Sequence, residues 1–435
     1  MLVNFSFKNF MSFRETQQFS MQRDMEARNP NWQNPDIVTA AALYGSNASG
    51  KSNFLKALEF VSNFVKSSFR DGDSAGRIFR NPFLLDKDSE GQDTEFLIEL
   101  ISRNVRYVYS FAINSNKVTF EELVAYYSAQ PTKLFVRRLD DEGELEITFS
   151  SAFSGPKKQL EKMTRPNALF FSVAAAAGSK VVDPVYQEIT SGIFCFDSAT
   201  YRSELGFIKR AAVVHPEKVD ALSNLIKCAD MGVKGIEIRR DDSILGPLGG
   251  SIDSLQEDPE VKSALKMQYG SDIFFLHQGE EGDVWLPSAS ESDGTIASLV
   301  FFSIALDALL WGKTLLVDEL DRSLHPVLLK DFVALFTDPV TNPNQAQLVF
   351  TTHDASLILG SQANGATLDR DQIWLVQKDE YGASELVAVT EYSPRSNENI
   401  GRNYLNGVYR AVPSLSFHEQ FAHYVIQQKA GDGNV

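Results

Sequence analysis

The chain is poor in cysteine and in basic residues. It has 435 residues but only two cysteines, Cys195 and Cys228, which stand in dissimilar sequence contexts. Two such thiols form neither a disulfide framework nor a CxxC metal pair, which fits a reducing cytoplasm. The 41 lysines and arginines face 57 acidic residues, so the net charge is -16. This balance disfavours non-specific nucleic-acid binding, although it is compatible with a local basic groove.

Long hydrophobic runs are also scarce. The N-terminal sequence MLVNFSFKNFMSF alternates apolar and polar residues, so it predicts a strand rather than a secretory signal. One long apolar run, residues 294–311, barely reaches the length of a membrane span and contains Asp307. We therefore expect a buried helix there, and a cytoplasmic protein without membrane partners. Sustained heptads, internal repeats and low-complexity tracts are absent, so no long coiled-coil arm is expected.

Short apolar segments dominate instead, and they predict the secondary structure. Four runs have the length of buried strands and are separated by helical patterns, which is typical of a largely parallel α/β sheet: 37–44, 314–320, 347–353 and 372–378. Residues 94–113 and 117–150 alternate like antiparallel strands, whereas residues 154–230 look mainly helical. Residues 231–290 return to a strand pattern, interrupted by an acidic loop near 241–260.

The most specific motif follows the strand expected at 37–44. Residues 45–52 read Gly-Ser-Asn-Ala-Ser-Gly-Lys-Ser and match G-x-x-x-x-G-K-[ST] between a strand and a helix. Glycines let the backbone wrap around phosphates, and the helix N-terminus adds positive potential. Lys51 is expected to reach the β- and γ-phosphates of ATP, and the Ser52 hydroxyl to ligate Mg²⁺. The predicted ATP-binding residues are Gly45, Ser46, Asn47, Ala48, Ser49, Gly50, Lys51 and Ser52.

Two further strands end in groups that suit phosphoryl transfer. The strand at 314–320 brings Asp318 and Glu319 to the carboxyl edge of the sheet, where ligands bind in such folds. Asp318 is expected to orient Mg²⁺, and Glu319 to polarise the attacking water. His353 ends the next strand, where it would bond the γ-phosphate and hold the water in line. His325, which follows the acidic pair before a proline, is either a D-loop residue or part of an ordinary proline-terminated loop.

Together these motifs resemble ABC-type ATPases of the SMC/DNA-repair branch, most closely the stand-alone prokaryotic ATPases grouped with abortive-infection and OLD-like proteins. The order is a phosphate loop, S-D-G-T before a helix, LLVDELDRSLHP and TTH, with the tail YLNGVYRAVP at 404–413. The resemblance implies an ABC-ATPase head of α/β class: a phosphate loop and a mixed sheet with helices on both faces. It further implies an N-terminal lobe at 1–150, a mainly helical insertion at 151–270 and a C-terminal lobe at 271–435.

In that family the ATP site is shared between two head-to-tail protomers, each of which supplies a signature motif to the other. Carried onto this chain, the signature residues are Ser292, Gly294 and Thr295. Asp293 departs from the pattern, because the family usually has glycine there and a carboxylate beside phosphates is unfavourable unless it points away. His325 matches the LHP variant of this branch. The Q-loop glutamine is also missing from its expected place near residues 81–83.

The resemblance also suggests what the ATPase does. OLD-like relatives carry a Toprim nuclease domain after the ATPase, but only 82 residues follow His353, which is too few for one. We therefore expect an ATP-hydrolysing homodimer, or a higher homo-oligomer, that uses Mg²⁺ and regulates a separate nuclease or toxin in anti-phage defence. The alternative is a DNA repair ATPase acting directly on DNA through basic pairs such as 137–138 and 239–240. A transporter subunit is a weaker third hypothesis.

Overall fold

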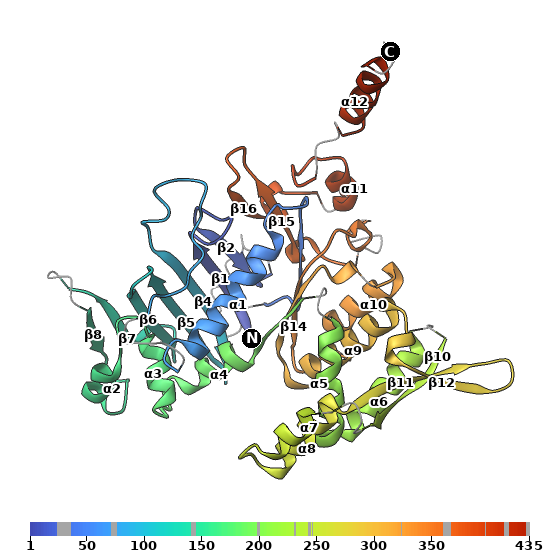
Figure 1. The fold of residues 1–435 in the computed structure, drawn as a ribbon. Coiled ribbons are helices and arrows are strands. Elements are labelled where there is room, and N and C mark those ends of the chain that lie inside the picture. The colour runs from blue at the N-terminus through green and yellow to red at the C-terminus, as the bar shows by residue number, and fades with distance from the viewer. Residues whose placement is uncertain are drawn as a thin grey trace.

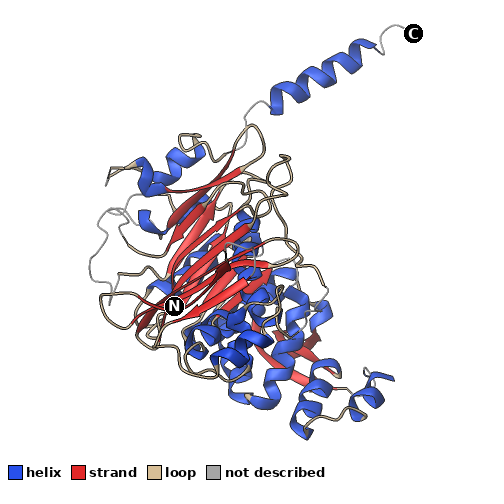
Figure 2. Ribbon diagram, turned by 90° about the vertical axis from the view of Figure 1, so that its left-hand side faces the viewer, coloured by secondary structure: helices blue, strands red, loops and turns tan. Residues whose placement is uncertain are grey.

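The computed structural model describes most of the chain. The described residues are 1–23, 36–70, 76–140, 145–197, 201–229, 232–241, 245, 247–322, 324–359, 367–395, 397–412 and 417–431. They form two large sheets, a smaller third sheet and helices packed around them (Figures 1 and 2).

The first large sheet is antiparallel and built mainly from the N-terminal part of the chain. Its seven strands are, in spatial order, β2 (Gln17–Ser20), β1 (Leu2–Lys8), β4 (Thr94–Ser102), β5 (Val105–Ile113), β6 (Val118–Tyr126), β7 (Thr132–Leu139) and β8 (Leu145–Phe149). The alternating sequence buries every second side chain, as with Val3, Phe5 and Phe7 of β1. The antiparallel strands expected from this alternation are confirmed.

The second large sheet carries the site. Its six strands are, in order, β16 (Ser384–Ala388), β15 (Ile373–Lys378), β3 (Ala40–Tyr44), β14 (Gln347–Thr351), β13 (Thr314–Asp318) and β9 (Ile193–Asp197). All neighbours pair in parallel except β15 and β16. The parallel sheet expected from the apolar runs is thus confirmed, and the carboxyl ends of β3, β13, β14 and β15 share one edge.

Both faces of this sheet are covered, because successive residues of each strand enter different cores. Ala41 and Leu43 of β3 pack in one core with α1 (Lys51–Ser67) and the seven-stranded sheet. Ala40 and Ala42 pack in the other core with α9 (Asp293–Trp311) and α10 (Pro326–Thr337). The expected helices on both faces are confirmed, and α1 lies between the two sheets (Figure 1). Three short helices complete the first core: α2 (Lys157–Met163), α3 (Phe170–Ala176) and α4 (Asp183–Ser191).

The middle of the chain, residues 151–270, is mainly helical but is not set apart from the sheet. Its strand β9 is an edge strand of the six-stranded sheet and pairs with β13. Beyond β9 come α5 (Tyr201–Val214), α6 (Pro216–Cys228), α7 (Pro247–Asp253) and α8 (Pro259–Tyr269). A three-stranded sheet packs against α5, α6 and α8: β10 (Val233–Arg240), β11 (Ser271–Gln278) and β12 (Asp283–Pro287). The helices α7 and α8 replace part of the strand and loop pattern predicted there.

The apolar run is the helix α9, which packs against the sheet. Its first half is buried from Thr295 to Phe301. Its last turn is not, because Leu310 and Trp311 are 58% and 69% exposed, so the expectation that the helix is buried through Trp311 is wrong at this end. Among the described residues α9 alone is long and apolar enough to cross a membrane, and 56% of it is buried within the protein.

The chain ends in two further helices. The short α11 (Ile400–Leu405) lies beside the β15–β16 hairpin, and α12 (Phe417–Gly431) projects away from the body (Figures 1 and 2). Residues 413–416 between them, including Pro413 of the tail motif, lie outside the described residues.

Candidate nucleotide-binding site

The phosphate loop joins β3 to α1, as its sequence predicts. Close packing explains its two glycines. A Cβ atom at Gly45 would stand 2.5 Å from the Val376 carbonyl oxygen, and one at Gly50 would stand 2.5 Å from the Ser384 hydroxyl. Gly50 also has a φ of 117°, a left-handed conformation that glycine tolerates best. The neighbouring strands β15 and β16 therefore fix the shape of the loop.

Lys51 is buried at the first position of α1 and spans the loop. Its ammonium group donates to the carbonyl oxygens of Gly45 and Ser46, at 2.9 and 3.0 Å. Burial lowers the pKa of Lys51, while the charges of Asp318 and Glu319 act in the opposite direction. The lysine thus holds the loop together and keeps a cation beside the acidic pair.

The acidic pair ends β13 at the same edge. Thr351, buried at the end of β14, links the two residues: its hydroxyl donates to Asp318 Oδ1 at 2.6 Å and accepts the Glu319 N–H at 2.7 Å. Glu319 has a φ of 51°. Its carboxylate, 44% exposed, lies 3.3 Å from Arg322. Thr351 was not predicted, although the TTH pattern of its strand contains it.

His353 lies just beyond β14 and faces the same charges. Its backbone N–H donates to Asp321 Oδ2 at 3.2 Å. Burial among neighbouring atoms and the positive charge of Lys51 lower the pKa of His353, against the opposite effect of Asp318, Glu319 and Asp321. The imidazole is therefore neutral near pH 7 and can both donate and accept a hydrogen bond.

These groups surround one cavity of about 460 Å³, a volume within the range of small-molecule sites. Its lining combines the motifs that the sequence separates: Asn47, Ala48, Ser49, Gly50, Lys51, Ser52, Asn53, Asp318, Glu319, His353 and Lys378. Lys378, at the end of β15, was not predicted. Its ammonium group donates to the Ala48 carbonyl oxygen at 3.0 Å and adds a second positive charge to the rim.

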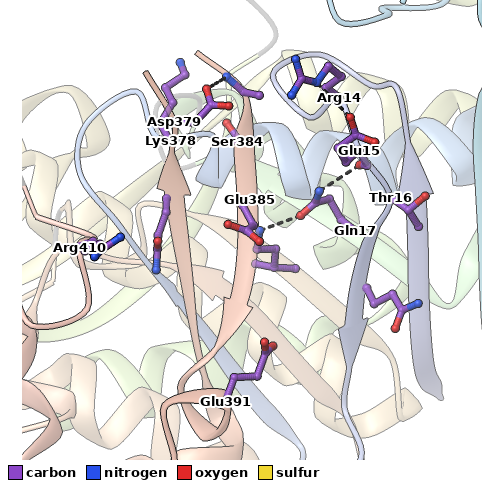
Figure 3. A pocket seen from close by; sticks show the side chains of 14 residues that line it. Arg14, Glu15, Thr16, Gln17, Lys378, Asp379, Ser384, Glu385, Glu391 and Arg410 are labelled. Carbon is purple, nitrogen blue, oxygen red and sulfur yellow. Dashed lines mark hydrogen bonds and ion pairs between the residues drawn. The ribbon is translucent and has the colours of Figure 1, made fainter. Parts of the chain in front are cut away.

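A wider groove of about 660 Å³ opens beside this cavity, between β2 and the β15–β16 hairpin (Figure 3). Lys378 and Ser384 border it at the end nearest the phosphate loop. The Ser384 hydroxyl donates to the Ser49 carbonyl oxygen at 2.5 Å. Gln17 ties β2 to β16, since its side-chain oxygen accepts the Leu386 N–H at 2.8 Å. The hairpin is thereby held against both the loop and the first sheet.

The residues present fit a magnesium nucleotide. The Ser52 hydroxyl and the Asp318 carboxylate line the same cavity, and Mg²⁺ bound to phosphates needs only one or two protein oxygens. The described residues contain no cluster of three or more His, Cys, Asp or Glu side chains for a metal held by protein alone. Two buried oxygens at the site, Ser49 Oγ and Asp321 Oδ1, make no hydrogen bond. Such orphaned groups are the kind that a polar ligand satisfies.

The predicted signature residues lie elsewhere, at the start of α9, and do not line the cavity. Ser292 is the N-cap: its hydroxyl accepts the Thr295 N–H at 3.1 Å. Gly294 lies in the first turn of α9, and Thr295 is buried. Asp293 is bound by Arg202 of α5, 2.6 Å away, and this hydrogen bond lowers the pKa of the carboxyl group. The charge that the sequence left unexplained is thus paired within the chain.

The other predicted positions have local roles. His325 caps α10, because its Nδ1 atom accepts the Val327 N–H at 3.3 Å, and it does not line the cavity. At the expected Q-loop place, the Asn81 carbonyl oxygen accepts the Met11 N–H at 2.6 Å. The adjacent Ser12 accepts a hydrogen bond from Asn53 at 2.8 Å, so this segment reaches the first turn of α1 indirectly.

Comparison with known proteins agrees with this geometry. A family model described as "AAA domain, putative AbiEii toxin, Type IV TA system" matches residues 40–166 and 208–359, more than half of the chain. The matched residues include the phosphate loop, the acidic pair, the start of α9 and His353. No curated protein matches the chain.

A solved structure is similar at low identity: the crystal structure of the Smc head domain with an extended coiled coil, bound to the C-terminal domain of ScpA, from Pyrococcus furiosus. It is 12% identical, with a TM-score of 0.34, and the alignment covers 90% of this chain and 97% of that one. The family match identifies the chain: it belongs to the family described as AAA domain, putative AbiEii toxin, Type IV TA system.

Proposed function

We propose that the protein is an ATP-hydrolysing switch that pairs head to tail around nucleotide and controls a separate effector in anti-phage defence. One observation carries the proposal. Three strands far apart in the sequence bring the phosphate loop, the acidic pair and His353 to a single cavity. The start of α9 does not line that cavity, which agrees with a signature that acts on the site of a second copy.

In this proposal the chain's own groups divide the work of hydrolysis. The phosphate-loop amides and Lys51 bind the phosphates, and bound Mg²⁺, held by Ser52 and Asp318, supplies charge neutralisation. Glu319 accepts a proton from the attacking water. The water oxygen bonds to the γ-phosphorus, and the bond between that phosphorus and the oxygen that leaves with ADP breaks. The neutral His353 donates a hydrogen bond to the γ-phosphate. Thr351 fixes the backbone on which Asp318 and Glu319 stand.

The signature would complete the site in the dimer. Ser292 and Gly294 of the partner subunit would present a hydroxyl and a backbone N–H at a helix start, where positive potential favours an anion. The pairing of Asp293 with Arg202 supports this role, because it reduces the repulsion between the carboxylate and the γ-phosphate.

The family description, which names a putative toxin of a type IV toxin–antitoxin system, supports a role in defence. We propose that ATP-dependent pairing holds a nuclease or toxin inactive, or releases it. Direct action on DNA gains no support from the basic pairs noted in the sequence. Arg137 is buried in an ion pair with Glu121, and Arg239 is stacked on Phe274 and Trp285.

The test compares Glu319→Gln with Lys51→Ala in the full-length protein. Glu319→Gln should lower the ATP turnover rate by roughly 100-fold or more and leave ATP binding intact, because only the proton acceptor is lost. Lys51→Ala should abolish binding. Normal turnover by Glu319→Gln would remove Glu319 as the base.

Size-exclusion chromatography with light scattering should find an ATP-dependent dimer in Glu319→Gln that Ser292→Arg prevents. Loss of ATP binding by Ser292→Arg would contradict action in trans.

A further inference from the structure

The described residues of the tail motif, 404–412, have no part in the site described so far, yet they pack beside it. Three attachments tie the tail and α11 to the carboxyl ends of neighbouring strands. The Gly401 N–H donates to the Ile358 carbonyl oxygen, at 2.9 Å, a few residues beyond His353. The Gln377 side chain, next to Lys378, donates to the Tyr409 carbonyl oxygen at 3.0 Å. The third attachment reaches the phosphate loop.

That third attachment is Tyr404, whose side chain is only 5% exposed. Its ring packs edge to face on Tyr44, the last residue of β3, with the ring centroids 5.3 Å apart. Its hydroxyl lies near the backbone N–H of Gly45, the residue that follows Tyr44. Burial and the nearby charge of Asp321 raise the pKa of Tyr404, so the phenol keeps its proton at neutral pH.

Gly45 connects this contact to the catalytic lysine. Its N–H lies near the Tyr404 hydroxyl, and its carbonyl oxygen accepts the hydrogen bond from Lys51 at 2.9 Å. A Cβ atom at Gly45 would collide with the Val376 carbonyl, so the residue sits in a tight gap. Removal of the hydroxyl would leave this polar N–H next to an apolar ring edge, which is unfavourable, and the loop would shift. The shift would move the carbonyl that orients Lys51.

The position of α11 depends on equally close contacts. A Cβ atom at Gly401 would stand 2.8 Å from the Ile358 carbonyl oxygen and 2.9 Å from its carbonyl carbon. These are backbone atoms, which do not rotate away as a side chain would. Any side chain at this position must therefore push α11 away from the segment after His353. Because Tyr404 is on the same short helix, its hydroxyl would move with it.

We propose that Tyr404 is a positioning residue for the phosphate loop, and that the tail motif acts as a brace that keeps the loop ready for nucleotide. The inference rests on the proposed ATPase function. It assigns the tail to nucleotide affinity rather than to the chemical step. Tyr404 lies near the loop at Gly45 and does not line the cavity that contains the acidic pair and His353, so the turnover rate at saturating ATP should change little.

The experiment uses Tyr404→Phe in the full-length protein, which keeps the buried ring and removes only the hydroxyl. Tyr409→Phe is the matched control, because Tyr409 is also buried in the same tail but its ring packs on Tyr392 rather than on Tyr44. Binding of a fluorescent ATP analogue, steady-state hydrolysis and thermal unfolding are measured for both. Tyr404→Phe should raise the ATP dissociation constant and the KM about tenfold, with kcat within about twofold of wild type. Tyr409→Phe should leave all three unchanged.

A second variant tests the brace without altering Tyr404 itself. Gly401→Ala should displace α11 and weaken ATP binding in the same direction as Tyr404→Phe. Wild-type ATP affinity in both variants would overturn the inference while leaving the ATPase function intact. So would a fall in kcat at unchanged KM, or a fall in melting temperature without a change in affinity. A wild-type protein that neither binds nor hydrolyses ATP would instead remove the proposed function, and the inference with it.

Discussion

The two large sheets both bury charged groups, but they differ in how completely those groups are hydrogen-bonded and ion-paired within the protein. In the seven-stranded sheet Glu121 is fully buried: its carboxylate accepts the Tyr109 hydroxyl at 2.9 Å and the N–H groups of Phe170 and Phe171 at 2.8 Å. Arg137 lies 3.5 Å away and donates to three backbone carbonyls of the segment that precedes α3. This cluster therefore has no capacity left for a ligand.

At the carboxyl edge of the six-stranded sheet, some buried polar atoms lack hydrogen-bond partners. Ser49 Oγ and Asp321 Oδ1 are buried without a hydrogen bond, and Ala48 and Glu319 have left-handed backbones that non-glycine residues rarely adopt. Unsatisfied buried atoms and left-handed residues also occur elsewhere in the described residues, but here both coincide with the phosphate loop and the acidic pair. The contrast teaches that buried charge alone does not mark a site. A fully paired cluster stabilises a fold, whereas one with unmet partners is prepared for a ligand.

The largest effect is expected when the buried Glu121–Arg137 cluster is disrupted. Arg137→Met should lower the free energy of unfolding by about 3–5 kcal/mol, because Glu121 would be left as an uncompensated buried charge. Chemical denaturation measures the loss. ATP turnover per folded molecule should be unchanged, since the cluster lies outside the cavity. Adding Glu121→Gln should restore part of the stability, because no buried charge remains and the amide oxygen can still accept the Phe171 N–H and the Tyr109 hydroxyl. A single variant as stable as wild type would contradict the structural role.

The next prediction tests whether Thr351 holds the acidic pair in the position that hydrolysis requires. Thr351→Val removes the hydroxyl that bridges Asp318 and Glu319, and it should lower kcat by roughly tenfold or more while costing about 1–3 kcal/mol of stability. Thr351→Ser keeps the hydroxyl and serves as the control. If valine and serine have equal turnover, the bridge does not hold the acidic pair.

A smaller effect should follow from pH. The pKa of His353 is lowered from 6.5, so the imidazole is neutral at pH 7–8 and gains a proton only below that value. Turnover should therefore be flat from about pH 8 to 6.5 and fall as the pH drops through the lowered pKa. In the unfolded chain the pKa of His353 is not lowered, so the unfolded state takes up this proton first as the pH falls. The contribution of neutral His353 to the free energy of unfolding is therefore also lost as the pH falls. His353→Gln, slower throughout, should lack this acid limb in a pH–rate profile.

The smallest effect concerns the exposed pair at the signature. Arg202→Ala should leave the melting temperature unchanged, because exposed ion pairs contribute little to stability. It should instead weaken ATP-dependent dimerisation, since Asp293 would then face the incoming phosphates unpaired. Sedimentation or light scattering across a range of salt concentrations measures this, and high salt should reduce the difference. Arg202→Ala combined with Asp293→Ala should dimerise like wild type.

The strands, the phosphate loop and the acidic pair could be predicted because their signals are local. A strand, a glycine turn and a helix start are contiguous in residues 40–52, and each has its own composition. Other parts depend on partners remote in sequence. Ser384 reaches Ser49 across 335 positions, and Lys378 reaches Ala48 across 330. No spacing rule connects such residues before the sheet order is known.

Tertiary pairing also overrode one local pattern. The residues of β9 lie within a stretch of mainly helical character, yet they form a strand because the edge of β13 offers a parallel partner. Asp293 shows the same limit on the scale of one side chain. Its sequence neighbours indicate only a helix start, whereas its partner, Arg202, comes from a helix 91 positions earlier.

The left-handed backbone of Glu319 has a consequence for the history of such proteins. Glycine would adopt that conformation without the cost of about 1 kcal/mol that a side chain adds. In the proposed mechanism, the folding preference for glycine and the need for a proton acceptor therefore act in opposite directions at this position. A related protein with glycine at position 319 and an intact phosphate loop would bind ATP without hydrolysing it, so its ATP-bound state would persist.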